Sequence, residues 1–244
     1  LLVEVNDDTP TVGSNLMVHL DDDALTGGIP GGIGDVTPDV QNDTGTLSHS
    51  HGADGGSMRW LTDGAPAGFS YALNEGDLLI RQGELTVITL SLDPLTGVYH
   101  AVQNAPVLNE LGLSENNQNF SVNYLVTDGD GDTVTGILDI IVNDDTPSGS
   151  FNGVVQLDDD ALAQGNPGGV GDILEDGLLY VGNLDCGFGA DGGAIGWLDS
   201  DAPNGFVYAS SGDQMWIQQN GETLMTLTLD PGTGDFSVRQ ERAL

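Results

Sequence analysis

Positive charge is almost absent from this chain of 244 residues. It contains no lysine and only four arginines, against 38 acidic residues, which gives a formal net charge of −34. Nucleic acids and anionic membrane surfaces are bound through Lys and Arg, so this composition argues against both as partners. Two carboxylates about 4 Å apart repel by roughly 4 kcal/mol at an effective dielectric near 20. A few such pairs would offset a domain's whole stability of about 5–15 kcal/mol, so the acids must be dispersed in water or neutralised by bound cations.

Cysteines and long apolar runs are scarce as well. Cys186 is the single cysteine, so an intrachain disulfide is excluded and no redox compartment is indicated. No apolar run approaches the roughly 20 residues that a membrane span requires, so we expect no membrane insertion. The chain begins with Leu1 rather than Met, so the lack of a signal peptide at its start carries no information.

The acids that are present are unusual in kind and position. Thirty are Asp and eight are Glu, and the aspartates are bunched with glycine between apolar segments. A disordered acidic tail would instead form an uninterrupted run with few apolar residues. A salt-adapted surface would scatter Glu and Asp, many of them on helices, and this explanation stays open as the alternative. The Asp-Gly bunching favours bound metal.

An internal repeat divides the sequence into two copies of one module, offset by 137 residues. The repeat predicts a complete module at 6–142 and a second at 143–244, with 1–5 as the last strand of a preceding module. The second copy has no counterpart of residues 108–142, so we expect it to be truncated or split by an insertion. The matching pairs are NDDTP (6–10, 143–147), LDDDAL (20–25, 157–162), PGGIGD and PGGVGD (30–35, 167–172), GADGG (52–56, 189–193), WLTDGAPAGFSY and WLDSDAPNGFVY (60–71, 197–208), and LSLDPLTG and LTLDPGTG (90–97, 227–234).

The apolar pattern predicts strands throughout. Apolar residues alternate with polar ones at 119–127, which is the period of a half-buried strand, and 133–142 follows as its hairpin partner across the DGDGD turn. DPLTG is a second hairpin signal. No long apolar face with helical period is found. The fold class is therefore all-β, with tandem β-sandwich modules and a short helical turn at DDDAL capped by its own aspartate.

Calcium is the cation that best fits this ligand set, because it takes six to eight oxygens in irregular geometry. Asp128, Asp130 and Asp132 alternate with glycine, so their side chains can converge on one ion. They match the first, third and fifth positions of a helix-loop-helix calcium loop, but Thr133 stands where that loop needs glycine, and strands flank it. We predict a calcium loop in a β-hairpin, and an ordinary solvated turn is the alternative.

Further candidate ligands lie in the repeated loops. NDDTP joins one module to the next, so its acids can share an ion with a neighbouring module's loop. Consecutive acids on a strand point to opposite faces, so we expect one or two of each DDD triplet to bind. For the single acids in the Gly-rich turns, a simple turn role stays open. The candidates are Asp7, Asp8, Asp144 and Asp145 in NDDTP; Asp21, Asp22, Asp23, Asp158, Asp159 and Asp160 in LDDDAL; Asp35 and Asp172 after PGG; and Asp54 and Asp191 in GADGG.

Other chemistry finds little support, and we expect no enzyme activity. GGIPGGIGD lacks the lysine of a phosphate-binding loop, and Asp35 comes one residue too early for the calcium β-roll nonapeptide. His49 and His51 are replaced by Cys186 and Phe188 in the second copy, which favours a surface strand or turn over a transition-metal site. Cys186 has no histidine paired with it as a base.

The tryptophans carry two different expectations. Trp60 and Trp197 recur in register with Phe69 and Phe206, as core anchors would. Trp216 has no aromatic counterpart in the first copy, which leaves a sugar-stacking role open.

Taken in order, LDDDAL…GG.GD, GADGG…WL…AP.GF.Y, LDP.TG and YLVTDGDGDTVTG…I.VNDDTP resemble the long repeat modules of giant repeats-in-toxin (RTX) adhesins. The resemblance spans essentially the whole chain. It implies a bacterial protein that is exported by type I secretion and displayed at the cell surface. There, calcium-stiffened β-sandwich modules hold ligand-binding domains away from the cell in adhesion and biofilm formation.

The resemblance also implies partners and ligands. The partners would be neighbouring modules and, in some members, a ligand-binding domain inserted into a module, so that host or surface glycans and peptides are reached only indirectly. The calcium loops would be Asp128, Asp130 and Asp132, with the NDDTP aspartates at the joints. The alternative function is direct, calcium-dependent binding of sugar or peptide by these modules.

Overall fold

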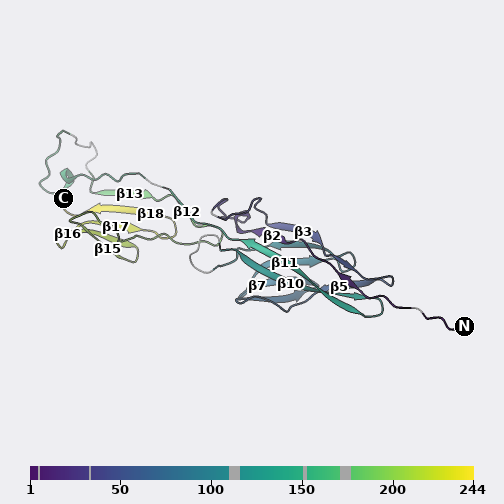
Figure 1. The fold of residues 1–244 in the computed structure, drawn as a ribbon. Helices are drawn as coiled ribbons and strands as arrows, with labels where there is room; N and C mark the ends of the chain where they lie inside the picture. Colours follow the sequence, from purple (N-terminus) through teal and green to yellow (C-terminus); the bar gives the residue numbers. More distant parts are fainter. Residues whose placement is uncertain (5, 33, 110–115, 151–152, 171–176) are drawn as a thin grey trace. The chain divides into compact units, whose positions relative to one another are not determined.

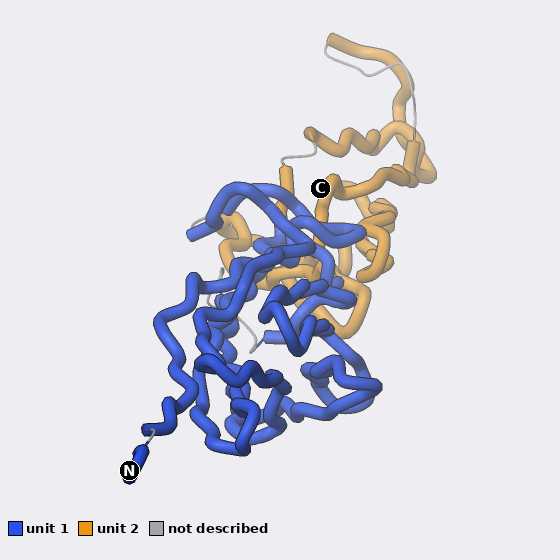
Figure 2. Tube along the Cα trace, turned by 90° about the vertical axis from the view of Figure 1, so that its right-hand side faces the viewer, with its two compact units in different colours: residues 1–147, 189–192 blue, residues 148–188, 193–244 orange. Residues whose placement is uncertain are grey.

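The computed structural model describes residues 1–4, 6–32, 34–109, 116–150, 153–170 and 177–244. Its contacts divide the chain into two compact units (Figure 2). Unit 1 comprises residues 1–147 together with the short loop 189–192, and unit 2 comprises residues 148–188 and 193–244. Both units are built from β-strands, so the predicted all-β fold class is confirmed. Among the described residues, no helix has the length and hydropathy needed to cross a membrane.

The first sheet of unit 1 has four strands in the order β2-β11-β10-β5 (Figure 1). Strands β10 and β11 form the predicted hairpin, with Thr127 opposite Thr133 across the DGDGD turn. Strand β2 pairs with β11 in parallel, and β5 pairs with β10 in antiparallel orientation. The bounds are β2 (Val18–Asp21), β5 (Gly56–Trp60), β10 (Gln118–Asp128) and β11 (Thr133–Asn143).

The second sheet of unit 1 has five antiparallel strands in the order β3-β9-β8-β7-β6. The predicted hairpin around DPLTG is present between β8 and β9. A separate short pair joins β1 to β4. The bounds are β1 (Thr11–Val12), β3 (Asn42–Thr46), β4 (His49–Ser50), β6 (Phe69–Asn74), β7 (Asp77–Gln82), β8 (Leu85–Leu92) and β9 (Val98–Gln103).

Both sheets of unit 1 bury their apolar side chains in one shared core. Trp60 is fully buried, and its ring meets that of Tyr124 edge to face, with the ring centroids 6.4 Å apart. Phe69 of the five-stranded sheet meets Phe120 of the four-stranded sheet in the same way at 4.9 Å. Two sheets that share a core in this manner form the predicted sandwich, with Trp60 as an anchor.

Unit 2 repeats the five-stranded sheet of unit 1. Its order β13-β18-β17-β16-β15 matches β3-β9-β8-β7-β6 strand for strand at the offset of 137 residues. Even the β-bulge recurs, after Ile80 in unit 1 and after Ile217 in unit 2. Unit 2 also contains the short pair β12-β14. The bounds are β12 (Ser148–Gly149), β13 (Leu179–Asn183), β14 (Cys186–Gly187), β15 (Val207–Ser211), β16 (Gln214–Gln219), β17 (Glu222–Leu229) and β18 (Asp235–Gln240).

Two further features concern the ends of the repeated sequence. The described part of unit 2 contains no sheet equivalent to β2-β11-β10-β5. Leu1–Glu4, expected as the last strand of a preceding module, form no strand and are exposed. A strand needs a hydrogen-bonded neighbour, and the described residues provide none for this segment.

Candidate metal centres

The first acidic cluster lies at the DGDGD turn. Carboxylate oxygens of Asp54, Asp128 and Asp130 come within 4.8 Å of one another. The turn folds around Asp128, which is 5% exposed and whose Oδ1 accepts hydrogen bonds from the backbone N–H groups of Gly131 (3.0 Å) and Asp132 (2.7 Å). Its other oxygen, Oδ2, is buried and has no hydrogen-bond partner. Buried polar atoms are nearly always satisfied, so this oxygen is suited to a metal ion.

A second cluster shares Asp130 with the first and adds Asp7 and Asp132, all three exposed. Asp7 comes from NDDTP, and the adjacent Asp8 ties this segment to the GADGG loop by accepting a hydrogen bond from the N–H of Ala53 (3.0 Å). The motifs NDDTP, GADGG and DGDGD therefore meet at one place in unit 1, although they lie far apart in the sequence.

A third cluster is formed by Asp21, Asp23, Asp35 and Asp39. Asp21 accepts a hydrogen bond from the N–H of Asp23 (2.9 Å) and so caps the short 3₁₀ turn η1 (Asp22–Ala24), as predicted. Asp23 is buried, and its Oδ2 accepts from the N–H of Gly31 (3.2 Å). Oδ1 of Asp23 and Oδ1 of Asp35 are both buried without a hydrogen-bond partner, so two ligand oxygens are unused.

Asp39 was missed by the sequence analysis. It stands alone between Pro38 and Val40, without an adjacent acid or glycine. The available signal was its position four residues after Asp35 in the same turn-rich segment.

The middle aspartate of the triplet has a different role. Asp22 is 0% exposed, and its carboxylate accepts hydrogen bonds from the side-chain amide of Gln103 and from the N–H of Val107 (3.2 Å to Oδ2). Burial raises the pKa of Asp22 to about 8, so this group is largely protonated at neutral pH in the metal-free protein. The triplet is therefore divided, with Asp21 and Asp23 in the cluster and Asp22 in the interior. The division arises at a 3₁₀ turn and not along a strand.

The acids of the second NDDTP copy are also buried in unit 1. Asp145 is 6% exposed, and its Oδ2 accepts from the N–H groups of Ile29 (3.2 Å) and Ala190 (2.7 Å). The bond to Ala190 repeats that of Asp8 to Ala53 at the offset of 137 residues. Oδ1 of Asp145 is buried without a partner. Asp144 accepts from the N–H of Asn116 (3.1 Å).

Two further carboxyls of unit 1 have raised pKa values, because burial and neighbouring negative charges disfavour their ionised form. Burial, followed by the charges of Asp21 and Asp145, raises the pKa of Asp23 to about 7. Burial, followed by the charge of Asp144, raises the pKa of Asp191. The ion pairs found among the described residues, Arg239–Glu241 and Arg242–Glu222, both lie in unit 2, so no arginine neutralises the clusters of unit 1.

The second copy of the DDD triplet is only partly assembled. Asp158 caps the 3₁₀ turn η2 (Asp159–Ala161) by accepting from the N–H of Asp160 (2.9 Å), and the Gln240 amide donates to Asp159 as Gln103 does to Asp22. Asp172 lies outside the described residues. Within the described part of unit 2, no group of three acids with converging oxygens is found.

The remaining candidate side chains are divided between the two units. The rings of His49 and His51 lie 4.7 Å apart, and burial, followed by the charge of His49, lowers the pKa of His51. Cys186, Trp197 and Trp216 are half-buried in unit 2.

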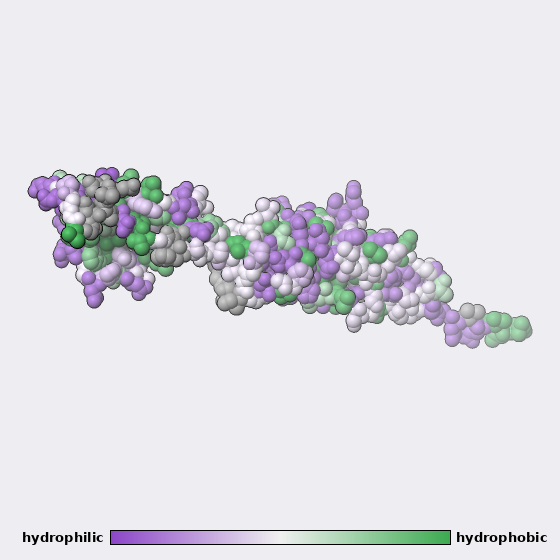
Figure 3. All heavy atoms as spheres, turned by 90° about the horizontal axis from the view of Figure 1, so that it is seen from above, coloured by the Kyte–Doolittle hydropathy of each residue, from purple (hydrophilic) through white to green (hydrophobic). Residues whose placement is uncertain are grey.

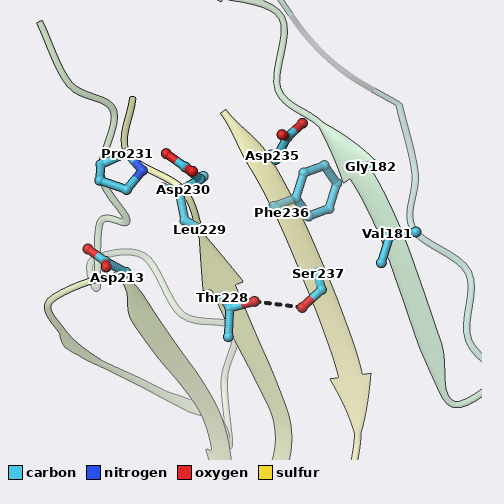
Figure 4. A pocket seen from close by; sticks show the side chains of 10 residues that line it. All are labelled: Val181, Gly182, Asp213, Thr228, Leu229, Asp230, Pro231, Asp235, Phe236 and Ser237. Carbon is cyan, nitrogen blue, oxygen red and sulfur yellow. Dashed lines mark hydrogen bonds between the residues drawn. The ribbon is translucent and has the colours of Figure 1, made fainter. Parts of the chain in front are cut away.

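An open pocket lies on the sheet of unit 2 (Figure 4). Asp213, Asp230 and Asp235 are among its lining residues, and Thr228 and Ser237 share a hydrogen bond of 2.6 Å there. The lining includes no His, Cys or Lys, so a hydroxyl there has no nitrogen base beside it.

Comparisons with known proteins do not assign a function to this chain. A scan against protein-family models and a search of curated proteins found no match for this chain. Because a β-sandwich hosts many unrelated functions, the assignment has to come from the acidic clusters themselves.

Proposed function

We propose that this chain is a calcium-binding structural segment of a bacterial cell-surface adhesin of the RTX type, and that it has no catalytic role. The observation that supports the proposal most is the set of buried carboxylate oxygens without hydrogen-bond partners, on Asp23, Asp35, Asp128 and Asp145. Each lies beside other carboxylates, where a bound cation would replace repulsion by attraction.

The ligand chemistry favours calcium over other metals. The three clusters consist of aspartates alone, and hard oxygen ligands suit Ca²⁺ and Mg²⁺ rather than zinc or copper. Mg²⁺ demands near-octahedral geometry and retains several waters, whereas Ca²⁺ accepts many protein oxygens from irregular loops. Each cluster joins acids from two separate segments of the chain and therefore fits calcium better.

Calcium binding would contribute strongly to folding. At a free concentration a hundredfold above the dissociation constant, each site adds about 2.7 kcal/mol. Two or three occupied sites would thus match the whole stability of an ordinary domain. Low cytosolic calcium would leave the chain unfolded for type I secretion, and the extracellular medium would fold it. Its partners would be the neighbouring modules, whose NDDTP segments join the clusters, and an inserted ligand-binding domain where a module is split.

The direct test is calorimetric unfolding of the chain in calcium, in magnesium and in a calcium chelator. We expect a large fall in melting temperature on chelation, and only partial recovery in magnesium. A melting curve that chelation does not move would overturn the proposal and leave a salt-adapted acidic surface as the better explanation.

A further inference from the structure

Unit 2 has a partly exposed apolar sheet face, and the equivalent face of unit 1 is covered. The side chains of Ile217, Met225 and Leu227 line a hollow of about 830 Å³, and Trp197 and Phe236 line a neighbouring one of about 330 Å³. These five residues are only half-buried. Apolar residues are visible in green at the surface of unit 2 (Figure 3).

The equivalent residues of unit 1 are fully or almost fully buried, which identifies the missing contacts. Subtracting the offset of 137 converts the five residues of unit 2 into Ile80, Ile88, Leu90, Trp60 and Tyr99. The first four of these are 0% exposed and Tyr99 is 4% exposed. Four of these positions lie in the five-stranded sheets, in the same strand order in both units, whereas Trp60 belongs to β5 and Trp197 to no strand. The four sheet positions are covered in unit 1 and only partly covered in the described part of unit 2.

The cover in unit 1 is largely the β10–β11 hairpin. Phe120, Val122 and Tyr124 of β10 and Leu138 and Ile140 of β11 belong to the same core cluster as the five-stranded sheet. Two ring contacts, Tyr124 with Trp60 and Phe120 with Phe69, attach the hairpin to the rest of unit 1. The hairpin thus presents a row of alternate large apolar side chains that fits this sheet.

We propose that the apolar face of the β13-β18-β17-β16-β15 sheet binds a β-hairpin of the β10–β11 type, supplied by polypeptide other than residues 1–244. The hairpin already present in this chain is ruled out as the occupant. Its Val122, Tyr124 and Leu138 are 0% exposed in unit 1, so its transfer to another copy would open the core of unit 1. The proposal concerns apolar packing and stands whether or not the acidic clusters bind calcium.

The test extends the chain with a second copy of residues 108–145, placed directly after Leu244, because Leu244 is the equivalent of Val107. We expect this extension to raise the melting temperature of unit 2 by about 10 °C, since burial of several large side chains is worth a few kcal/mol and 1 kcal/mol shifts a domain of this size by about 4–8 °C. Amide hydrogen exchange in β16 and β17 should slow at the same time.

Two matched controls separate specific docking from general effects. In the first, the added copy carries aspartate at the positions equivalent to Val122 and Ile140, and the rise should disappear. In the second, Leu227→Asp on the apolar face should abolish the rise, whereas Thr226→Asp, on the same strand but the opposite face, should preserve it.

Two results would overturn the proposal. One is an extended chain that melts no higher than the extension carrying the two aspartates. The other is a stable dimer of the unextended chain that Leu227→Asp dissociates, because the face would then be covered by a second copy.

Discussion

Substitution of Asp128 by asparagine separates a metal ligand from an ordinary turn residue. The amide side chain would keep an oxygen to accept the N–H groups of Gly131 and Asp132, which are 3.0 and 2.7 Å from Oδ1 in the wild type. It would replace the unpartnered Oδ2 by an NH₂ group, which cannot ligate a cation. The turn should therefore survive while the metal site is lost.

The substitution is expected to lower the stability of unit 1 in calcium but not in chelator. In calcium, loss of one site should cost about 2.7 kcal/mol at a hundredfold excess over the dissociation constant. With about 2–4 °C per kcal/mol for a domain of this size, the melting temperature of unit 1 should fall by about 5–10 °C. In chelator, the substitution removes a charge that repels Asp54 and Asp130, worth about 1 kcal/mol at 4 Å in water, so the variant should be equally or more stable.

Differential scanning calorimetry of wild type and Asp128→Asn in both buffers measures these changes. Asp77→Asn is a suitable control, because it removes one negative charge in the hairpin turn between β6 and β7, outside the acidic clusters. If Asp128→Asn lowered stability equally in calcium and in chelator, Asp128 would be a turn residue alone and the reasoning would be refuted.

Three further predictions concern the same fold. The folded-state pKa of Asp22 is raised to about 8 from 3.8, so its contribution to the stability of the chelated protein is present below about pH 4 and is lost as the pH rises to about 8. Unfolding of the chelated protein across this pH range should show that loss, and Asp22→Asn should flatten the profile. Trp60→Ala should destabilise unit 1 by about 3–5 kcal/mol in denaturant titrations, and Trp197→Ala should cost unit 2 clearly less, because Trp197 is only half-buried. Equal costs would contradict this difference in burial. Gly52→Ala should weaken calcium binding in a calorimetric titration, because Gly52 has φ +85° and an added Cβ would lie 2.6 Å from the carboxylate of Asp8. An unchanged affinity would show that the NDDTP segment does not contribute to the site.

The elements that the sequence predicted well are those with local signals. Alternation at period 2 and the DGDGD turn predicted the β10–β11 hairpin, and DPLTG predicted the β8–β9 hairpin. The capped turn at DDDAL follows from the ability of an aspartate to accept from the N–H two residues later. The repeat offset predicted that the sheet of unit 2 would copy the five-stranded sheet of unit 1.

The features that the sequence did not predict depend on which distant loops meet. The joining of Asp39 to Asp21, Asp23 and Asp35 depends on the path of the whole segment between β2 and β3, which no short motif encodes. The bond from Ala190 to Asp145 likewise depends on long-range folding, since it brings a loop of the second copy into unit 1. The partial exposure of the sheet in unit 2 was not predicted either, because the apolar pattern of its strands is similar to that of the buried strands in unit 1.

The most direct test of the central claim is a crystal structure of this chain grown in calcium, with anomalous scattering used to locate the ions. The account predicts an ion between Asp54, Asp128 and Asp130 at about 2.3–2.6 Å from their oxygens, and another between Asp21, Asp23 and Asp35. Ordered water alone at both positions, in the presence of saturating calcium, would contradict it.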